Sequence, residues 1–381
     1  MERPGLRPFI RPGTPQPFLN DLPSPGWEYD TGQFPAPPGH TLPELPAQQT
    51  FAALDLGTNN CRLMVAVRTS GGYRVVDTYS QMVRLGEGLQ GTGRLGESAM
   101  DRTLEVLRVC ALRLGRRQPA RFRAIATEAC RRATNGDAFL ERVRKETGIP
   151  IEVISGREEA ELAVESCAGI LRRDPARSRG LLIDIGGGST EVAWVRLSRN
   201  RQPHELIGFV SAPVGVITLS EMFPRGNEDY PAMVEYVASH LRPFERVHCI
   251  SREMKRGTVQ VVGTSGTVTT LACLALRLPR YIRSAIDGFC LGSQDAMGSI
   301  AELRAMKLTG MDRHPCIGPD RSRYILPGCA IFEAIHSVWT GEITVADRGL
   351  RDGMLLRMMR SGGSSHQEGR SMRGRSVRAG R

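Results

Sequence analysis

No stretch of this 381-residue chain is apolar over a length that could cross a membrane. The first residues also lack the apolar core of a secretory signal. These two absences argue against an integral membrane protein and against export. We therefore expect a cytoplasmic protein with no membrane partner.

Paired cysteine motifs are absent as well. The nine cysteines stand singly, without one C-x-x-C pair. This odd, scattered set argues against a disulfide framework and against a zinc site. We expect most of the cysteines to be small core residues in a reducing compartment.

Periodic apolar residues are lacking at both ends of the chain. Residues 1–48 hold twelve of the 24 prolines, which predicts a disordered Pro-rich tail. Residues 361–381 are rich in Ser, Gly and Arg, which predicts a second disordered tail that is basic and solvated. The formal net charge is +11, and most of it falls in residues 51–360. A basic folded part suits a polyanion, and the charge alone leaves nucleic acid and a phosphate chain both open.

The most informative stretch of the sequence is Gly180–Glu191. Its apolar run predicts a buried strand that carries Asp184 near its end and then breaks into three glycines. Glycines let a backbone approach a ligand closely and turn N–H groups toward an anion. An acid that leads into such a loop suggests a carboxylate on Mg²⁺ and amides on phosphate. The alternative is a strand followed by a hairpin turn.

Two further stretches resemble this one. Phe51–Asn60 has the same order of apolar run, Asp55, apolar residue and glycine, and Val261–Thr267 again places glycines after an apolar run. This self-similarity predicts a duplicated α/β domain with an acidic, amide-lined cleft between two lobes. We place the N-terminal lobe at residues 49–160 and the C-terminal lobe at residues 161–360.

Three polar residues outside these loops are candidates for the same site. Glu158 and Glu159 begin a helix that should join the lobes. Glu158 has a structural explanation as the capping-box partner of Ser155, whereas Glu159 could serve as a general base on water. Arg131 follows a predicted strand and could bind phosphate through its planar fork. In the C-terminal lobe, we expect the long helix Ser322–Trp339 to be interrupted near its Pro-Gly pair.

Together these segments resemble the exopolyphosphatase / guanosine pentaphosphate phosphatase family. Six segments occur in the family's order: Phe51–Asn59, Ala126–Ala133, Ile154–Ala160, Leu182–Glu191, Gly263–Thr267 and Asp347–Gly353. The family usually has Ser at the position of Asn60 and a hydrophobic residue at that of Cys130, and neither change should abolish the chemistry. Longer members carry an added helical part with a His-Asp motif, which this chain lacks, so it resembles the short two-domain form.

The resemblance implies a fold and a reaction. The fold is the duplicated actin-like one, shared with sugar kinases and Hsp70, with an interlobe cleft. The reaction is Mg²⁺-assisted hydrolysis of a terminal phosphoanhydride with release of orthophosphate. Glu159 would be the catalytic base, and Asp184 and Glu191 would be the metal-side acids. The residues implied to bind phosphate are Asp55, Gly57, Thr58, Asn59, Arg131, Gly186, Gly187, Gly188, Ser189, Gly263, Thr264, Ser265, Gly266 and Thr267.

The substrate stays open between two phosphoanhydrides. Inorganic polyphosphate is the leading expectation, and guanosine pentaphosphate (pppGpp) is the alternative. A kinase of the same fold is disfavoured by the acidic pair on the joining helix. A regulator that binds polyphosphate or nucleotide without cleaving it is disfavoured by the intact Glu159, Asp184 and Arg131. We expect no specific nucleic-acid partner, and the resemblance admits a homodimer.

Overall fold

The computed structural model describes three stretches of the chain: residues 49–171, 176–198 and 203–361. They belong to one compact unit, Gln48–Arg381. Both expected tails lie outside the described residues, apart from Ser361 at the end of the last helix. Within the described stretches, every helix is too short or too polar to cross a membrane.

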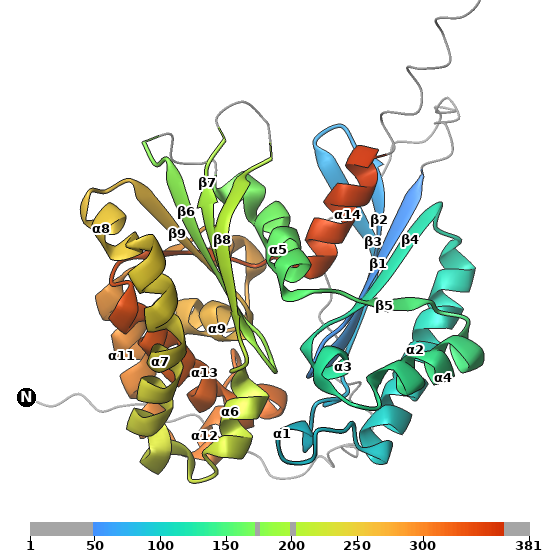
Figure 1. Cartoon of the computed structure of the whole chain (residues 1–381), viewed down its shortest axis with the longest axis horizontal. Coiled ribbons are helices and arrows are strands. Elements are labelled where there is room, and N and C mark those ends of the chain that lie inside the picture. Colours follow the sequence, from blue (N-terminus) through green and yellow to red (C-terminus); the bar gives the residue numbers. More distant parts are fainter. Residues whose placement is uncertain (1–48, 172–175, 199–202, 362–381) are drawn as a thin grey trace, which may run out of the picture. The chain divides into compact units, whose positions relative to one another are not determined.

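Five strands form the first sheet: β1 (Thr50–Leu56), β2 (Asn60–Thr69), β3 (Gly72–Met82), β4 (Arg121–Ala126) and β5 (Ile151–Val153). Their order is β3-β2-β1-β4-β5 (Figure 1). Short turns connect β1, β2 and β3, which are therefore antiparallel. Strands β4 and β5 run parallel to β1 and follow helical crossovers.

Six strands form the second sheet: β6 (Arg179–Ile185), β7 (Thr190–Arg196), β8 (Glu205–Ala212), β9 (Val259–Thr264), β10 (Cys290–Leu291) and β11 (Ile343–Ala346). Their order is β10-β11-β9-β6-β7-β8. Strands β6, β7 and β8 are antiparallel neighbours, and β9 and β11 continue the sheet in parallel on the other side of β6.

The two sheets repeat one topology. In each, an antiparallel meander is followed by parallel strands beside its first strand, and the second sheet adds only β10 at its edge. The register places Asp55 and Asp184 at equivalent positions, one residue before the end of β1 and of β6. Asp55 pairs with Arg62 on the neighbouring strand, and Asp184 pairs with Glu191. The predicted duplicated α/β fold is confirmed.

Helices cover both sheets. On the first sheet lie α1 (Leu89–Thr92), α2 (Glu97–Arg117), α3 (Glu128–Arg132) and α4 (Gly136–Thr147). The second sheet carries α6 (Val216–Met222), the 3₁₀ turn η1 (Gly226–Asp229), α7 (Tyr230–His248), α8 (Ile250–Lys255), α9 (Gly266–Ala275), α10 (Arg283–Ile286), α11 (Ser293–Ala305), α12 (Leu308–Arg313) and α13 (Pro319–Val338).

Two more helices, α5 (Gly156–Leu171) and α14 (Leu350–Ser361), lie between the sheets (Figure 1). One continuous core joins their apolar residues to residues of both sheets. Gly353 of α14 lies against α5, since a Cβ on it would be 2.1 Å from the carbonyl oxygen of Leu162. The expected lobe boundary, between residues 160 and 161, falls inside α5, and it stays a prediction.

Helix α13 runs unbroken, so the interruption expected near Pro327 is wrong. A proline inside a helix removes one backbone hydrogen bond. Here Pro327 and Gly328 are buried, beside α13 residues that belong to the core of the second lobe, and this packing outweighs the local preference. Gly328 also allows a close contact, because a Cβ there would be 2.3 Å from the hydroxyl of Thr267.

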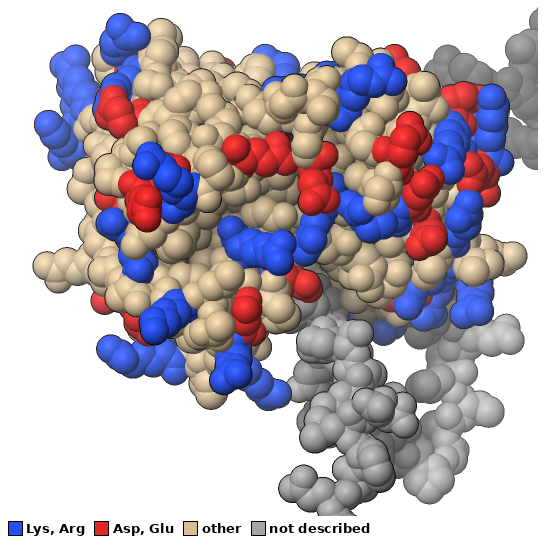
Figure 2. All heavy atoms as spheres, turned by 90° about the horizontal axis from the view of Figure 1, so that it is seen from below, with Lys and Arg blue, Asp and Glu red and all other residues tan. Residues whose placement is uncertain are grey.

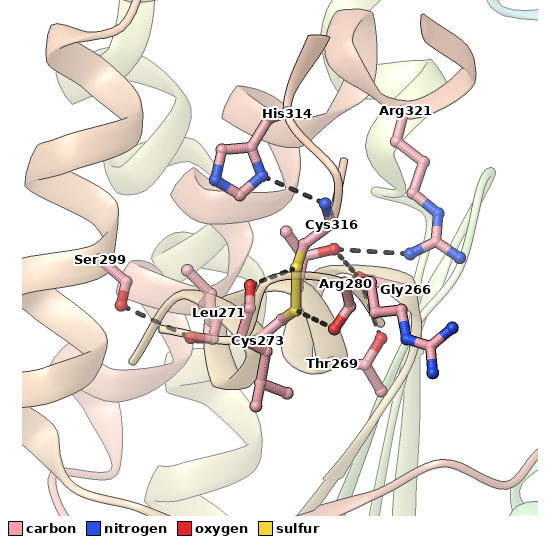
Figure 3. The surroundings of a disulfide bond; sticks show 11 residues. Gly266, Thr269, Leu271, Cys273, Arg280, Ser299, His314, Cys316 and Arg321 are labelled. Atoms are coloured by element: carbon pink, nitrogen blue, oxygen red, sulfur yellow. Dashed lines mark hydrogen bonds between the residues drawn. A yellow bond between two sulfur atoms is a disulfide. The ribbon is translucent and has the colours of Figure 1, made fainter. Parts of the chain in front are cut away.

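Cys273 of α9 and Cys316, which precedes α13, form a disulfide (Figure 3). The two cysteines are 43 residues apart, so only tertiary packing brings them together. The expectation of unpaired cysteines is wrong for this pair, although five of the seven free cysteines are buried as expected. Disulfides are rare in reducing compartments, and the cytoplasmic location therefore stays a prediction that this pair does not support.

Candidate active site

The turn between β1 and β2 carries the first group of predicted residues. The amide of Gly57 donates to the carbonyl of Asn60 at 2.9 Å, which closes the turn. One carboxylate oxygen of Asp55, Oδ1, is buried without a hydrogen-bond partner, and so is Oδ1 of Asn59. Two orphaned oxygens are costly in a protein interior unless they meet a donor or a cation. They mark this turn as a place where a ligand or metal ion would be stabilised.

The turn between β6 and β7 has the same form in the other lobe. The amide of Gly186 donates to the carbonyl of Ser189 at 2.9 Å. The φ angles of Gly186, Gly187 and Gly188 lie outside the left-handed region, so conformation does not demand glycine here. Glycine is required because the two loops approach each other closely. A Cβ on Gly188 would lie 2.6 Å from the Thr58 hydroxyl oxygen, and one on Gly187 would lie 3.2 Å from Thr58 Cβ. The glycine loops of the two lobes are thus in contact where a cleft was expected.

Carboxylates from both lobes influence one another at these loops. Burial raises the pKa of Asp184 to about 6, with the charge of Asp55 adding to the shift and Arg62 opposing it. Burial also raises the pKa of Asp55. Glu191 is buried, and burial together with Asp184 raises its pKa to about 7, although the Ser211 hydroxyl donates to Oε1 at 2.8 Å. Several carboxylates that resist ionisation together form an environment that favours a cation.

The set fits Mg²⁺ by chemistry. Mg²⁺ prefers oxygen ligands and is usually held by one or two carboxylates, with water or substrate phosphate completing its shell. Asp55 and Asp184 supply two such carboxylates, and Asp55 Oδ1 is without a partner. No cluster of three or more His, Cys, Asp or Glu side chains within the described stretches could enclose a metal by itself. The site therefore suits an ion that shares its shell with substrate.

In the third glycine loop, between β9 and α9, most of the predicted residues make contacts within the protein. Gly263 lies inside β9, where a Cβ would be 2.9 Å from Ile343, so it serves the core. Thr264 donates to the carbonyl of Arg348, and Thr267 packs on Gly328. Ser265 caps α9, because its hydroxyl accepts from the Val268 amide at 3.3 Å. Its hydroxyl is therefore used within the protein.

Arg321 was missed by the sequence analysis. Its guanidinium carbon lies 3.6 Å from the position of a Cβ on Gly266, at the start of α9 (Figure 3). Burial lowers the pKa of Arg321. A lone arginine near the start of a long helix gives no sequence signal, since only the packing of α13 on α9 brings it to the loop.

Glu159 and Arg131, predicted separately, are in contact. Glu159 lies in the first turn of α5 and is only 6% exposed. Nη1 of Arg131 donates to Glu159 Oε2 at 3.1 Å and to the carbonyl of Ile154 at 2.9 Å. Burial, Glu191 and Asp184 raise the pKa of Glu159 well above its usual range, and Arg131 opposes them. A buried carboxylate with a raised pKa is what a general base near neutral pH requires.

The other acid of the pair, Glu158, points elsewhere. Its amide donates to the Ser155 hydroxyl at 3.2 Å, so only this half of the expected capping box is formed. Its carboxylate pairs with Arg123 at 2.6 Å and with Arg357 at 3.5 Å. Glu158 thus has a structural role, whereas Glu159 faces the other carboxylates.

Comparison with known proteins identifies the family of this chain. The model of the Ppx/GppA phosphatase family matches residues 64–362. Exopolyphosphatase 2 of Mycobacterium tuberculosis is 29% identical over 320 residues, which cover 80% of this chain and 97% of that protein.

Solved structures of the same family are similar in fold. The Ppx/GppA family member of Aquifex aeolicus has a TM-score of 0.66 at 26% identity, over 82% of this chain and 98% of that one. An exopolyphosphatase from Cytophaga hutchinsonii has a TM-score of 0.72 at 25% identity, over 82% of this chain and 98% of that one. The chain belongs to the Ppx/GppA phosphatase family and is a phosphoanhydride hydrolase.

Proposed function

We propose that this protein is an exopolyphosphatase that hydrolyses the terminal phosphoanhydride of inorganic polyphosphate and releases orthophosphate. The observation that carries the proposal is the contact between buried Glu159 and Arg131, beside the carboxylates of both lobes. Relatives named as exopolyphosphatases, one of them 29% identical, support the substrate class.

Glu159 is the general base of this proposal. Its carboxylate accepts a proton from a water molecule, and the water oxygen then forms a bond to the terminal phosphorus. The bond from this phosphorus to the bridging oxygen breaks, and the shortened chain leaves with that oxygen. Such transfers pass through a loose transition state, so positioning and positive potential supply most of the catalysis.

Arg131 and the glycine loops hold the phosphate. The guanidinium can donate to phosphoryl oxygens, and so can backbone amides of Thr58–Asn59, Gly187–Ser189 and Gly266–Thr267. The amides of Gly57 and Gly186 already close their own turns. The hydroxyl groups of Thr58 and Ser189 lie in these same loops. A carboxylate repels phosphate, so we assign Asp55 to the metal side of the site together with Asp184, and Glu191 supports them.

Mg²⁺ is the proposed cofactor. When bound, it would neutralise charge on the phosphoryl oxygens. Asp55 and Asp184 would hold it, and the orphaned Oδ1 of Asp55 is the contact that the protein itself leaves unsatisfied.

The charge pattern of the chain bears on the substrate. The net charge of +11 favours a long polyanion over a small neutral ligand. On the face drawn in Figure 2, basic and acidic side chains are interspersed rather than separated. Local contacts, more than a uniform field, would therefore hold the phosphate chain on this face.

Orthophosphate release by the purified protein with Mg²⁺ tests the proposal. We expect release from long-chain polyphosphate, and a loss of about 10²- to 10⁴-fold in Glu159→Gln, because the base is removed while the shape is kept. Glu161→Gln, on the same helix, is the matched control and should retain activity.

Two other outcomes would redirect the assignment. Orthophosphate release from pppGpp alone would leave Glu159 as the proposed base and make pppGpp the proposed substrate. No release from either substrate by a folded protein would overturn the proposal and favour a phosphate-binding regulator. The homodimer and the cytoplasmic location stay predictions, which sedimentation and cell fractionation would test.

A further inference from the structure

The guanidinium of Arg131 is held along two edges. Nη1 contacts Glu159 and the carbonyl of Ile154, as described above. The other edge, Nε and Nη2, donates to Oε2 of Glu128 at 3.1 and 2.5 Å. An arginine has five N–H hydrogens, and these four contacts leave one on Nη2. The plane of the side chain is therefore fixed by Glu128 on one side and by Glu159 on the other.

Glu128 occupies an unusual place for a carboxylate. It is the first residue of α3, two residues after the end of β4, and it is only 7% exposed. Its Cγ would lie 3.1 Å from a Cβ on Gly188, so it borders the glycine loop of the opposite lobe. A buried negative charge beside a loop meant for phosphate opposes substrate binding unless it performs a task there.

A purely structural role explains this arrangement poorly. Ion pairs at i,i+3 contribute little to the stability of exposed helices. Helix α3 has five residues, so it depends on its surroundings rather than on such a pair. The second contact of Glu128, with Nε of Arg132, is long at 3.7 Å. The short contacts of Glu128 are thus directed at Arg131.

The alternative partner of Arg131 is the base itself. A guanidinium and a carboxylate pair most strongly through two parallel hydrogen bonds. If the Nε edge of Arg131 turned to Glu159, the base would be held as an ion pair and would accept a proton less readily. Glu128 occupies that edge and leaves only Nη1 for Glu159.

We propose that Glu128 is a positioning residue: it holds the Nε edge of Arg131, which keeps Arg131 from pairing bidentately with Glu159 and directs its remaining N–H toward phosphate. This inference rests on the proposed function, because it assigns Glu159 as base and Arg131 as phosphate ligand.

Kinetics of Glu128→Ala, Glu128→Gln and Arg131→Ala, alone and combined, test the proposal. We expect Glu128→Ala to lower kcat for orthophosphate release from polyphosphate by about 10- to 100-fold, a range typical of a misplaced catalytic group, and to raise KM as well, because the turned Arg131 no longer meets phosphate. Glu128→Gln keeps one acceptor oxygen and should recover part of the loss. In the Arg131→Ala background, Glu128→Ala should have no further effect. Glu141→Ala, an exposed glutamate on α4, is the control and should leave kcat unchanged.

If Glu128→Ala lowered kcat equally in the presence and in the absence of Arg131, the proposal would be overturned. A change in KM with an unchanged kcat would overturn it as well. A crystal structure of Glu128→Ala gives a readout that needs no turnover. Arg131 should have turned its Nε edge to Glu159, and an unmoved Arg131 would overturn the proposal even if the wild type cleaved neither substrate. An inactive wild type with a turned Arg131 would instead contradict the proposed function alone.

Discussion

Asp184 illustrates at the scale of one residue how a functional carboxylate can oppose stability. Its pKa in the folded protein is about 6, against an ordinary value of 3.8, chiefly because of burial and then the charge of Asp55. As pH rises from 3.8, the unfolded chain loses this proton first, whereas the folded protein keeps it up to about pH 6. The stability that the neutral acid provides at low pH is therefore lost as pH rises through about 6.

Asp184→Asn should thus stabilise the protein at pH 7.5 when divalent cations are removed by a chelator. We expect the free energy of unfolding to increase on the order of 2 kcal/mol, because the variant no longer buries a charged carboxylate. The increase should be seen as a higher Tm in thermal unfolding. The gain should shrink toward pH 4, where wild-type Asp184 is protonated as well. Glu302→Gln, an exposed change on α11, is the control. A Tm that falls at pH 7.5, or a gain independent of pH, would contradict this account.

Sequence reasoning could identify single residues but only part of their contacts. Glu159 and Arg131 came from two distant segments, and the structure brings them within 3.1 Å. Glu128 lies in the segment Ala126–Ala133, but the sequence analysis assigned it no function. Its spacing of three residues from Arg131 is nevertheless a local signal for an ion pair. Arg321 has no such signal, because its place beside Gly266 depends on how α13 packs on α9.

At the scale of elements, the crossing of α5 and α14 depends on one glycine. A Cβ on Gly353 would lie 2.1 Å from the oxygen and 2.9 Å from the carbon of the Leu162 carbonyl, both of which are backbone atoms of α5. Backbone cannot rotate away as a side chain can, so the helices would have to separate. Gly353→Ala should therefore destabilise the protein by about 1–3 kcal/mol, the range of overpacked cores.

Gly169→Ala is the matched control on α5, because a Cβ there meets nothing within 4 Å. Alanine is the better helix former by roughly 0.8–1 kcal/mol, so this change should stabilise the protein. Urea unfolding of both variants measures the difference in midpoint. If the unfolding midpoints of the two variants shifted in the same direction, the contact between residue 353 and Leu162 would not determine how closely α5 and α14 pack.

The elements that sequence reasoning predicted well are those with local signals. Alternating or continuous apolar runs followed by glycine turns located β1 and β6, and their likeness indicated the duplication. The predictions failed where distant segments decide the outcome. Burial keeps α13 continuous through Pro327, and the packing of α9 against the segment before α13 joins Cys273 to Cys316.

At the scale of the whole molecule, the two lobes each bring one acid to the same place. Asp55 lies one residue before the end of β1 in the first sheet, and Asp184 has the same place in β6 of the second. The charge of Asp55 raises the pKa of Asp184. The repulsion between them opposes the contact between the glycine loops. A divalent cation bound by both acids would relieve this repulsion and tie the lobes together.

Mg²⁺ should therefore raise the Tm of the wild-type protein even without substrate, by an amount that grows with the logarithm of its concentration above the Kd. The increase should be larger at pH 7.5 than at pH 5, because protons compete for Asp184, whose pKa is about 6. Asp55→Asn removes one of the two negative charges and replaces one carboxylate oxygen with an NH₂ group that cannot bind a cation. The increase in Tm of this variant should therefore be much smaller at both pH values. An increase in Asp55→Asn equal to that of the wild type would show that the ion binds elsewhere, and the two lobes would then be held together by α5, α14 and their shared core alone.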